Sequence, residues 1–227
     1  MRRLCAGLLV LLLLAYAGNA ARVGLANTAY FQARFLIDKW QRDPSSINQQ
    51  NFQQASETID RSVLLVPTNP HYLLTQAKVG LWGFYAGYRT AEQLEHLEVT
   101  YQSAVQQRPN WPETYADYAW YLSSVKQDLP GAWHQLQLAV QYGPYAADTL
   151  ETVMKVALNR WPDLTPVQKA TAYRWLAKSM HTATRNNVIA LIKLYKKEFV
   201  ACFYLKRQGN LSPELWALIE QQLCLPE

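Results

Sequence analysis

The sequence has little glycine, few charged residues, and no alternation of polar and apolar residues of the kind that marks a β-strand. Of its 227 residues, 9 are glycine and 17% are charged. The glycines are dispersed and follow no predicted strand, which excludes a phosphate-binding glycine loop for a nucleotide. Because a half-buried strand would show a period of two along the chain, the sequence predicts an all-α fold.

The chain also lacks a long run of basic residues. Its formal net charge is +5, and two of the positive charges belong to Arg2 and Arg3 at the N-terminus. Nucleic-acid binding depends on clustered lysine and arginine, so no nucleic-acid partner is expected. The 4 histidines lack the close spacing that zinc ligands usually have, either to one another or to a cysteine. We therefore expect no metal and no cofactor.

An apolar run follows the N-terminal arginines and covers residues 4–17. It is shorter than the ~20 apolar residues that span a bilayer and matches the ~7–15 residues of a signal-peptide core. Small residues around Ala17 and Ala20 suit a cleavage site. Residues 1–20 are therefore predicted to be a signal peptide or, because the chain stays apolar beyond Ala20, a short membrane anchor. Residues 21–227 are predicted to form a single α-helical repeat domain in the periplasm, or on the inner membrane facing the periplasm if the leader is retained.

The chain has 3 cysteines, and Cys5 lies in the leader. Cys202 and Cys224 remain in the body of the protein. An even number of cysteines in an exported protein favours a disulfide, which would connect the two ends of the C-terminal segment. Two buried thiols are the alternative.

Prolines punctuate the middle of the sequence at regular intervals. Pro67, Pro109 and Pro144 are separated by 42 and 35 residues, close to the ~34-residue period of tetratricopeptide-type helical hairpins. Before each proline, small and apolar residues recur at helical spacing: Ala55, Ile59 and Ser62; Leu97, Tyr101 and Ala104; Ala132, Leu136 and Ala139. The pattern predicts tetratricopeptide-like helical hairpin repeats, a right-handed α-solenoid, with additional C-terminal helices. An extra helical turn and loop near residues 80–87 would account for the longer interval between Pro67 and Pro109. A plain helical bundle is the alternative.

Capping residues and prolines set the expected helix boundaries. Thr90 with Gln93 and Thr165 with Gln168 have the spacing of capping boxes, and Asp128 is placed to cap a further helix. The expected helices cover residues 27–42, 48–66, 70–88, 91–107, 113–126, 130–142, 146–160, 165–181 and 186–203, with a last one from 212.

A more specific signal lies in RPNWPETYADYA, followed by YGPY and NRWPDL, within residues 100–165. The stretch resembles the VpsP-type polysaccharide biosynthesis proteins, a family of exported or membrane-anchored bacterial helical proteins. The residues on the family pattern are Arg108, Pro109, Trp111, Pro112, Asp117, Gly143, Pro144 and Trp161. The resemblance implies a role in making, polymerising or exporting surface polysaccharide, and it brings no enzymatic activity with it.

Aromatic residues crowd the hairpins on either side of Pro109. On the inner helices of a curved repeat stack, such residues grip an extended peptide or stack on a sugar ring. The candidate binding residues are Trp82, Tyr85, Trp111, Tyr115, Asp117, Tyr118 and Tyr121. The alternative for each aromatic residue is packing in the core. For Trp111 and Trp161, each just before a proline, a staple between adjacent hairpins is the expected role.

The sequence favours a non-enzymatic scaffold or accessory protein for bacterial exopolysaccharide biosynthesis or export, acting through protein–protein interaction in the envelope. Its expected partners are envelope proteins of a polysaccharide synthesis or export system, with the polysaccharide itself as a further candidate. Membrane contact is expected only through the N-terminal segment, if that is retained. A periplasmic carbohydrate-binding protein is the alternative. A carbohydrate-active enzyme is less favoured, because Glu113, Asp117 and the other carboxylates have the distribution of solvated helix faces, not of a catalytic pair.

Overall fold

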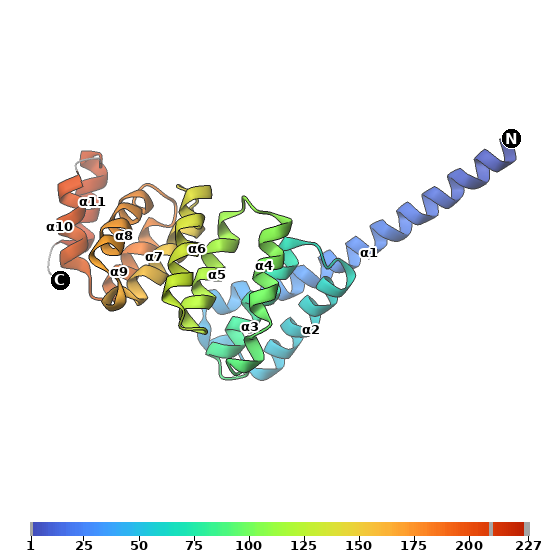
Figure 1. Cartoon of the computed structure of the whole chain (residues 1–227), viewed down its shortest axis with the longest axis horizontal. Coiled ribbons are helices and arrows are strands. Elements are labelled where there is room, and N and C mark those ends of the chain that lie inside the picture. Colours follow the sequence, from blue (N-terminus) through green and yellow to red (C-terminus); the bar gives the residue numbers. More distant parts are fainter. Residues whose placement is uncertain (1, 209–210, 225–227) are drawn as a thin grey trace. The chain divides into compact units, whose positions relative to one another are not determined.

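The computed structural model describes residues 2–208 and 211–224, with the side chains of residues 2–5 (Cys5 among them) and 208 outside the described part. Within it the chain forms eleven α-helices and no strand, which confirms the all-α prediction (Figure 1). The helices are α1 Arg2–Arg42, α2 Gln49–Leu65, α3 Pro70–Tyr85, α4 Leu97–Gln107, α5 Pro112–Ser124, α6 Leu129–Tyr142, α7 Ala147–Asn159, α8 Pro166–Ser179, α9 Arg185–Leu194, α10 Glu198–Gln208 and α11 Pro213–Leu223.

The chain divides into two compact units, Met1–Pro109 and Asn110–Glu227. Unit 1 contains α1 to α4, and unit 2 contains α5 to α11. The boundary falls inside the Arg-Pro-x-Trp-Pro stretch, so the motif ends one unit and begins the next.

In unit 1, α2 packs against α1 and α3, and α3 packs against α1 and α4. The shared core contains Ala26, Ala33, Ile37, Trp40, Phe52, Ala55, Ile59, Tyr72 and Val79. The small residues of the repeat pattern are used as expected, because Ala55 and Ser62 lie fully buried where α1 crosses α2. The Ser62 hydroxyl donates a hydrogen bond of 2.9 Å to the carbonyl oxygen of Ala26, which satisfies both buried groups.

In unit 2, neighbouring helices pair and alternate helices also touch. The helix α5 packs against α6 and α7, and α7 packs against α8 and α9. Hydrogen bonds join residues that are 36 or 37 apart: Arg160 to the Ser123 carbonyl, Thr184 to the Ala147 carbonyl, and Asn187 to the Glu151 carboxylate. The helices α5 and α7, and likewise α7 and α9, therefore lie side by side.

Most predicted helix ends are close to those observed, and the predicted caps form. The Asp128 carboxylate accepts from the Gly131 amide, and Thr165 and Gln168 form a capping box. Thr90 and Gln93 also bond to each other, but Gln93 belongs to a short 3₁₀ turn at Glu92–Leu94. The helix expected from residue 91 begins only at Leu97.

Two other helix predictions are wrong. The helix expected from Asn27 is the end of the 41-residue helix α1. The helix expected over 186–203 is two helices, because the chain turns between α9 and α10 with Lys196 at a φ of 54°. The Lys197 amide closes this turn by donating to the Ile192 carbonyl at 3.0 Å. No glycine or proline marks the break in the sequence.

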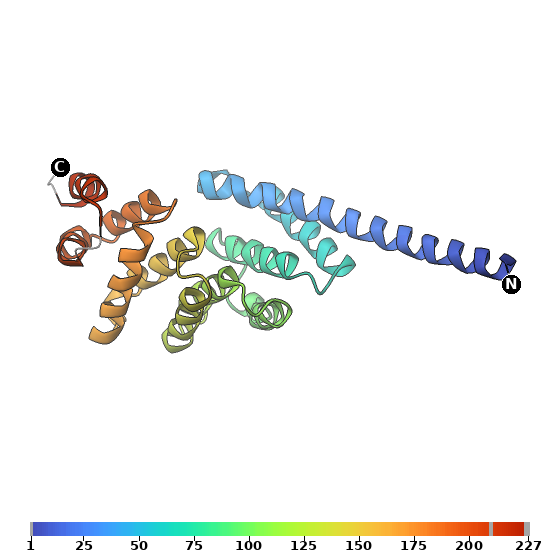
Figure 2. The ribbon, with the colours of Figure 1, turned by 90° about the horizontal axis from the view of Figure 1, so that it is seen from above.

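The N-terminal half of α1 projects beyond α2, as Figures 1 and 2 show. The side chains from Leu8 to Leu14 are 54–67% exposed, and the first fully buried residue of the helix is Ala26. Among the described residues, α1 is the helix long and apolar enough to cross a membrane. Its position and composition are those of a signal sequence or an N-terminal anchor.

A disulfide joins Cys202, inside α10, to Cys224 at the end of α11, with the two Cα atoms 5.5 Å apart. It fastens the last two helices of unit 2 to each other. Disulfides of this kind persist in oxidising compartments, which fits an exported protein.

Candidate functional site

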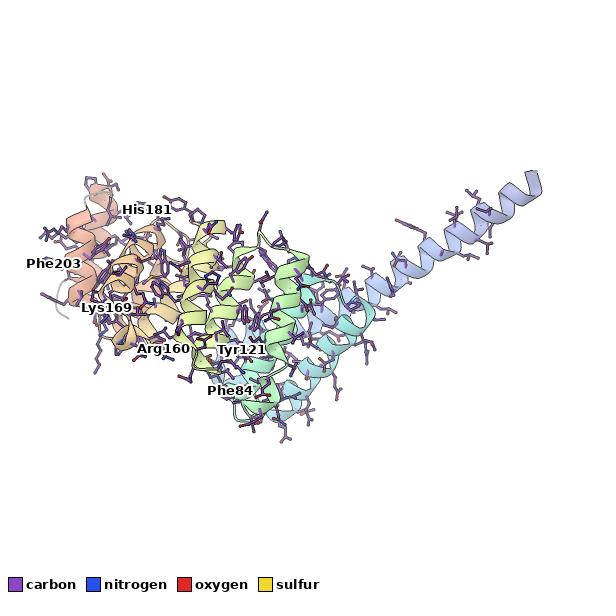
Figure 3. The ribbon with its side chains drawn as sticks, viewed as in Figure 1. Phe84, Tyr121, Arg160, Lys169, His181 and Phe203 are labelled. Atoms are coloured by element: carbon purple, nitrogen blue, oxygen red, sulfur yellow. A yellow bond between two sulfur atoms is a disulfide. The ribbon has the colours of Figure 1, made fainter. Side chains whose placement is uncertain are left out.

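Three of the predicted binding residues on α5 lie inside unit 2. Tyr115 and Tyr118 are 5% and 7% exposed, and Tyr121, labelled in Figure 3, has no exposed surface. The ring of Tyr115 stacks on Tyr142 of α6 at 5.4 Å, and Tyr118 stacks on Tyr121 at 6.4 Å. These rings stabilise the α5–α6 hairpin by packing, and they leave the surface of α5 to other residues.

The two candidates on α3 belong to unit 1. Trp82 is half-buried against Trp40 of α1, with ring centroids 5.9 Å apart. Tyr85 is half exposed at the end of the helix, where its ring meets Phe84 edge-on. Trp82 thus packs between helices, whereas Tyr85 offers one edge to solvent.

Residues of the family pattern that are far apart in sequence meet at the base of the α5–α6 hairpin. A methyl group built on Gly143 would lie 2.6 Å from Pro112 Cγ and 3.0 Å from Ala146 Cβ. Gly143 is therefore needed for the start of α5 to approach the end of α6. Trp111 is the residue before α5 and caps it without a side-chain hydrogen bond. Arg108, at the end of unit 1, lies 3.4 Å from the His71 imidazole.

Trp161 packs within an aromatic cluster of unit 2. It lies in a short 3₁₀ turn after α7, and its ring meets Tyr173 of α8 edge-on at 5.1 Å. Tyr173 in turn stacks on Tyr204 of α10 at 4.6 Å. Trp161 therefore packs the α7–α8 turn onto α8, and Tyr173 carries the aromatic packing on to α10.

Unit 2 also has a polar surface on α5, α7 and α9, which we call the three-helix face. Leaving out the first residue of each helix, most of the residues of α5 and α7 that are not buried are spaced three or four apart. They therefore share one side of each helix. The three-helix face consists of Glu113, Asp117, Trp120 and Ser124 on α5; Asp148, Glu151, Thr152, Lys155 and Asn159 on α7; and Asn187 and Tyr195 at α9.

A lysine and a tryptophan form the centre of the three-helix face. The Lys155 ammonium of α7 lies over the Trp120 ring of α5, 4.1 Å from its centroid, a cation–π contact. Part of the lysine side chain stays exposed. Burial of its nitrogen lowers the pKa of Lys155 below the ordinary value, although the Glu151 and Asp117 carboxylates favour the charged form. Cation, ring and carboxylates thus bridge two successive hairpins.

Replacing Lys155 by methionine is expected to raise the free energy of unfolding at pH 7 by less than about 1 kcal/mol, since methionine covers Trp120 without desolvating a charge. The pKa of Lys155 is lower in the folded protein than in the unfolded chain, where it has the ordinary value of 10.5. At pH values between the two, the unfolded chain therefore binds more protons than the folded protein. The destabilisation caused by burying the charged lysine is fully present below the pKa of Lys155 in the folded protein. It decreases as the pH rises through that pKa. Urea unfolding of both proteins should therefore show a smaller difference at pH 10 than at pH 7. A difference that grows with pH would contradict this assignment.

The α9 end of the three-helix face is fixed by two hydrogen bonds. The Asn187 amide donates to the Glu151 carboxylate at 2.8 Å, and the Asn159 amide donates to the Tyr195 hydroxyl at 3.2 Å. The sequence-based candidates include Asp117 but miss Lys155 and Asn187. The sequence held one signal for Lys155. It follows Trp120 by 35 residues, the same interval that separates Pro109 from Pro144.

The three-helix face displays several kinds of hydrogen-bonding group. Carboxylates, an ammonium, amides and a hydroxyl are displayed on a rigid helical surface, and each can hydrogen-bond to a peptide. Among the residues that the structure describes, no three histidine, cysteine, aspartate or glutamate side chains lie close enough to hold a metal ion. No protein-family model and no curated protein matches the sequence, so the VpsP-type resemblance stays a prediction.

Proposed function

We propose that this protein is a tetratricopeptide-like scaffold of the bacterial envelope that holds a protein partner in exopolysaccharide biosynthesis or export. The repeat assignment is supported by paired helices, by contacts between alternate helices, and by hydrogen bonds that link residues 36 or 37 apart. In such stacks, each hairpin buries its apolar side against the next and leaves a continuous surface for binding.

The envelope location is supported by two features at opposite ends of the chain. The N-terminal half of α1 is apolar and exposed, and Cys202 and Cys224 form a disulfide. Together they favour the periplasm, or the periplasmic side of the inner membrane where α1 is retained as an anchor. The polysaccharide role itself rests on the VpsP-type resemblance of residues 100–165.

The observation that carries the scaffold assignment is the three-helix face. Its side chains come from equivalent positions of three successive hairpins, and cation–π and hydrogen-bond contacts hold them in place. A preorganised polar surface of this length suits an extended peptide segment, because few side chains must be ordered on binding. The Trp120 ring already carries the Lys155 ammonium on one side, which favours a peptide over a sugar ring stacked there.

The test is the amount of secreted and surface polysaccharide in a strain that lacks the protein. We expect a loss that the intact chain restores. A chain with Glu151→Lys should restore it poorly, because the substitution reverses the charge beside Lys155 and breaks the bond to Asn187. Gln137→Lys, which adds a positive charge at an exposed position of α6, is the control and should restore fully.

A second readout separates a scaffold from an indirect effect. A photoactivatable residue at Thr152 of the three-helix face should crosslink to an envelope protein, whereas one at Gln137 should not. Unchanged polysaccharide in the deletion strain would overturn the polysaccharide role. Equal crosslinking at both positions would overturn the role of the three-helix face.

A further inference from the structure

Unit 1 contains a polar cavity between α2, α3 and the segment that leads into α4. Its volume is about 140 Å³. The apolar part of the lining comes from Ile59, Val79 and Leu97, and the polar part includes Asp60 and Arg89. A cavity of about 150 Å³ holds one six-membered carbon ring, so this one has room for a small ring with its substituents toward solvent.

The cavity exists because the first repeat interval is the longer one. The segment between α3 and α4 adds a turn at Gly87, with a φ of 77°, followed by the 3₁₀ turn Glu92–Leu94. The residues of this added segment form one wall of the cavity through Arg89, Leu94 and His96. The added segment therefore builds one wall of this site.

Arg89 is held in position by its backbone and by Phe52. Its amide donates to the Gly83 carbonyl at 3.1 Å, and its guanidinium lies 5.7 Å from the centroid of the Phe52 ring, which also stacks on Tyr88. The guanidinium reaches the Ser56 hydroxyl at 3.4 Å. A methyl group on Gly83 would lie 2.5 Å from the Phe52 ring, so glycine is required there. The arginine at the cavity is thus a preorganised donor.

The opposite wall offers groups that suit hydroxyls. The Gln76 amide donates to the Asp60 carboxylate at 2.7 Å, which fixes both side chains and leaves further acceptor and donor positions on each. His96 adds an imidazole at the rim. A guanidinium fork matches a carboxylate, and the Asp60–Gln76 pair matches hydroxyl groups. Ile59, Val79 and Leu97 are 0–2% exposed and close the inner end of the cavity, so a ring is held between its polar walls.

We propose that this cavity binds a hexuronate, a six-membered sugar ring that carries one carboxylate. The carboxylate pairs with Arg89 and His96, the ring occupies the space between the walls, and the hydroxyls bond to Asp60 and Gln76. The site lies in unit 1, so it is independent of the three-helix face of unit 2 and adds a small-molecule ligand to a protein-binding scaffold.

Calorimetric titration of the intact chain in detergent tests this with three probes. Glucuronate carries ring hydroxyls as well as a carboxylate. Glucose lacks the carboxylate, and cyclohexanecarboxylate lacks the hydroxyls. We expect saturable binding of glucuronate at about 10 mM or below, and affinities for the other two weaker by about tenfold or more, since each loses charged or neutral hydrogen bonds. Equal binding of glucose and glucuronate, or no binding of glucuronate, would overturn the proposal.

Variants locate the site within the chain. Arg89→Met should weaken glucuronate binding about tenfold or more, and Arg89→Lys should recover only part of it, because a point charge does not replace the planar fork. His96→Ala changes an exposed residue, and it should weaken binding even if Arg89→Met disturbs the packing on Phe52. Arg61→Met, at an exposed position of α2 outside the cavity lining, is the matched control and should bind as the native chain does. Native affinity in both Arg89→Met and His96→Ala would exclude this cavity.

Discussion

Replacing Trp40 by alanine is expected to lower the free energy of unfolding by about 3–5 kcal/mol, the usual cost of removing a large ring from a core. Trp40 has no exposed surface and packs against Trp82, where α1 meets α3. A loss of this size is a large fraction of the 5–15 kcal/mol that typically stabilises a folded protein. The substitution should therefore destabilise unit 1 before unit 2.

The matched control lies on the same helix. Phe35 is 64% exposed, so Phe35→Ala removes a ring of comparable size with a change within about 0.5 kcal/mol. Urea unfolding followed by far-ultraviolet circular dichroism measures both variants, and amide hydrogen exchange assigns the loss to unit 1 or unit 2. Equal destabilisation by the two substitutions would show that the buried face of α1 is not the one described.

Loss of the Cys202–Cys224 disulfide is expected to lower the stability of the α10–α11 pair by about 3 kcal/mol, the chain-entropy value for a loop of this size. The two cysteines are 22 residues apart in sequence, and the bond closes the connection between the two helices. Without it, the pair depends on the burial of Ala201, Leu205 and Ile219. We expect α11 to become protease-sensitive first.

A reducing agent and the Cys202→Ala, Cys224→Ala double variant should have the same effect. Limited proteolysis of the native chain should release α11 only after reduction, whereas the double variant should release it under both conditions. Because the variant has no bond to reduce, it is the control for other effects of the reducing agent. A native chain that resists proteolysis equally with and without the reducing agent would contradict the prediction.

The parts of the fold that local chemistry determines could be predicted from the sequence. The caps at Asp128, Thr165 and Ser212 form because each side chain bonds to a backbone amide two or three residues further on. The break at Lys196 could not be predicted, since lysine rarely adopts a positive φ and no residue nearby signals a turn. There the packing of α10 against α8 and α9 determines the chain path.

The candidate site shows the same division. Aromatic residues occur on several sides of α5, so the sequence alone could not separate buried Tyr121 from half-buried Trp120. Whether a side chain is buried depends on which neighbour covers it. For Trp120 that neighbour is Lys155, which lies 35 residues further along the chain. The position of Asp117 could be found from the motif, whereas its electrostatic partner on α7 required the packed structure.

The continuity of α1 has a mechanical consequence. No loop separates the exposed apolar segment from Ala26, where packing begins, so the helix acts as a stiff rod of about 27 Å from Leu8 to that point, at 1.5 Å per residue. Where the leader is retained in a membrane, tilting or rotating the rod carries unit 1 with it. The bilayer then sets the direction in which unit 1 faces. Where the leader is removed after Ala20, less than two turns of helix precede the core, and unit 1 is released to tumble freely.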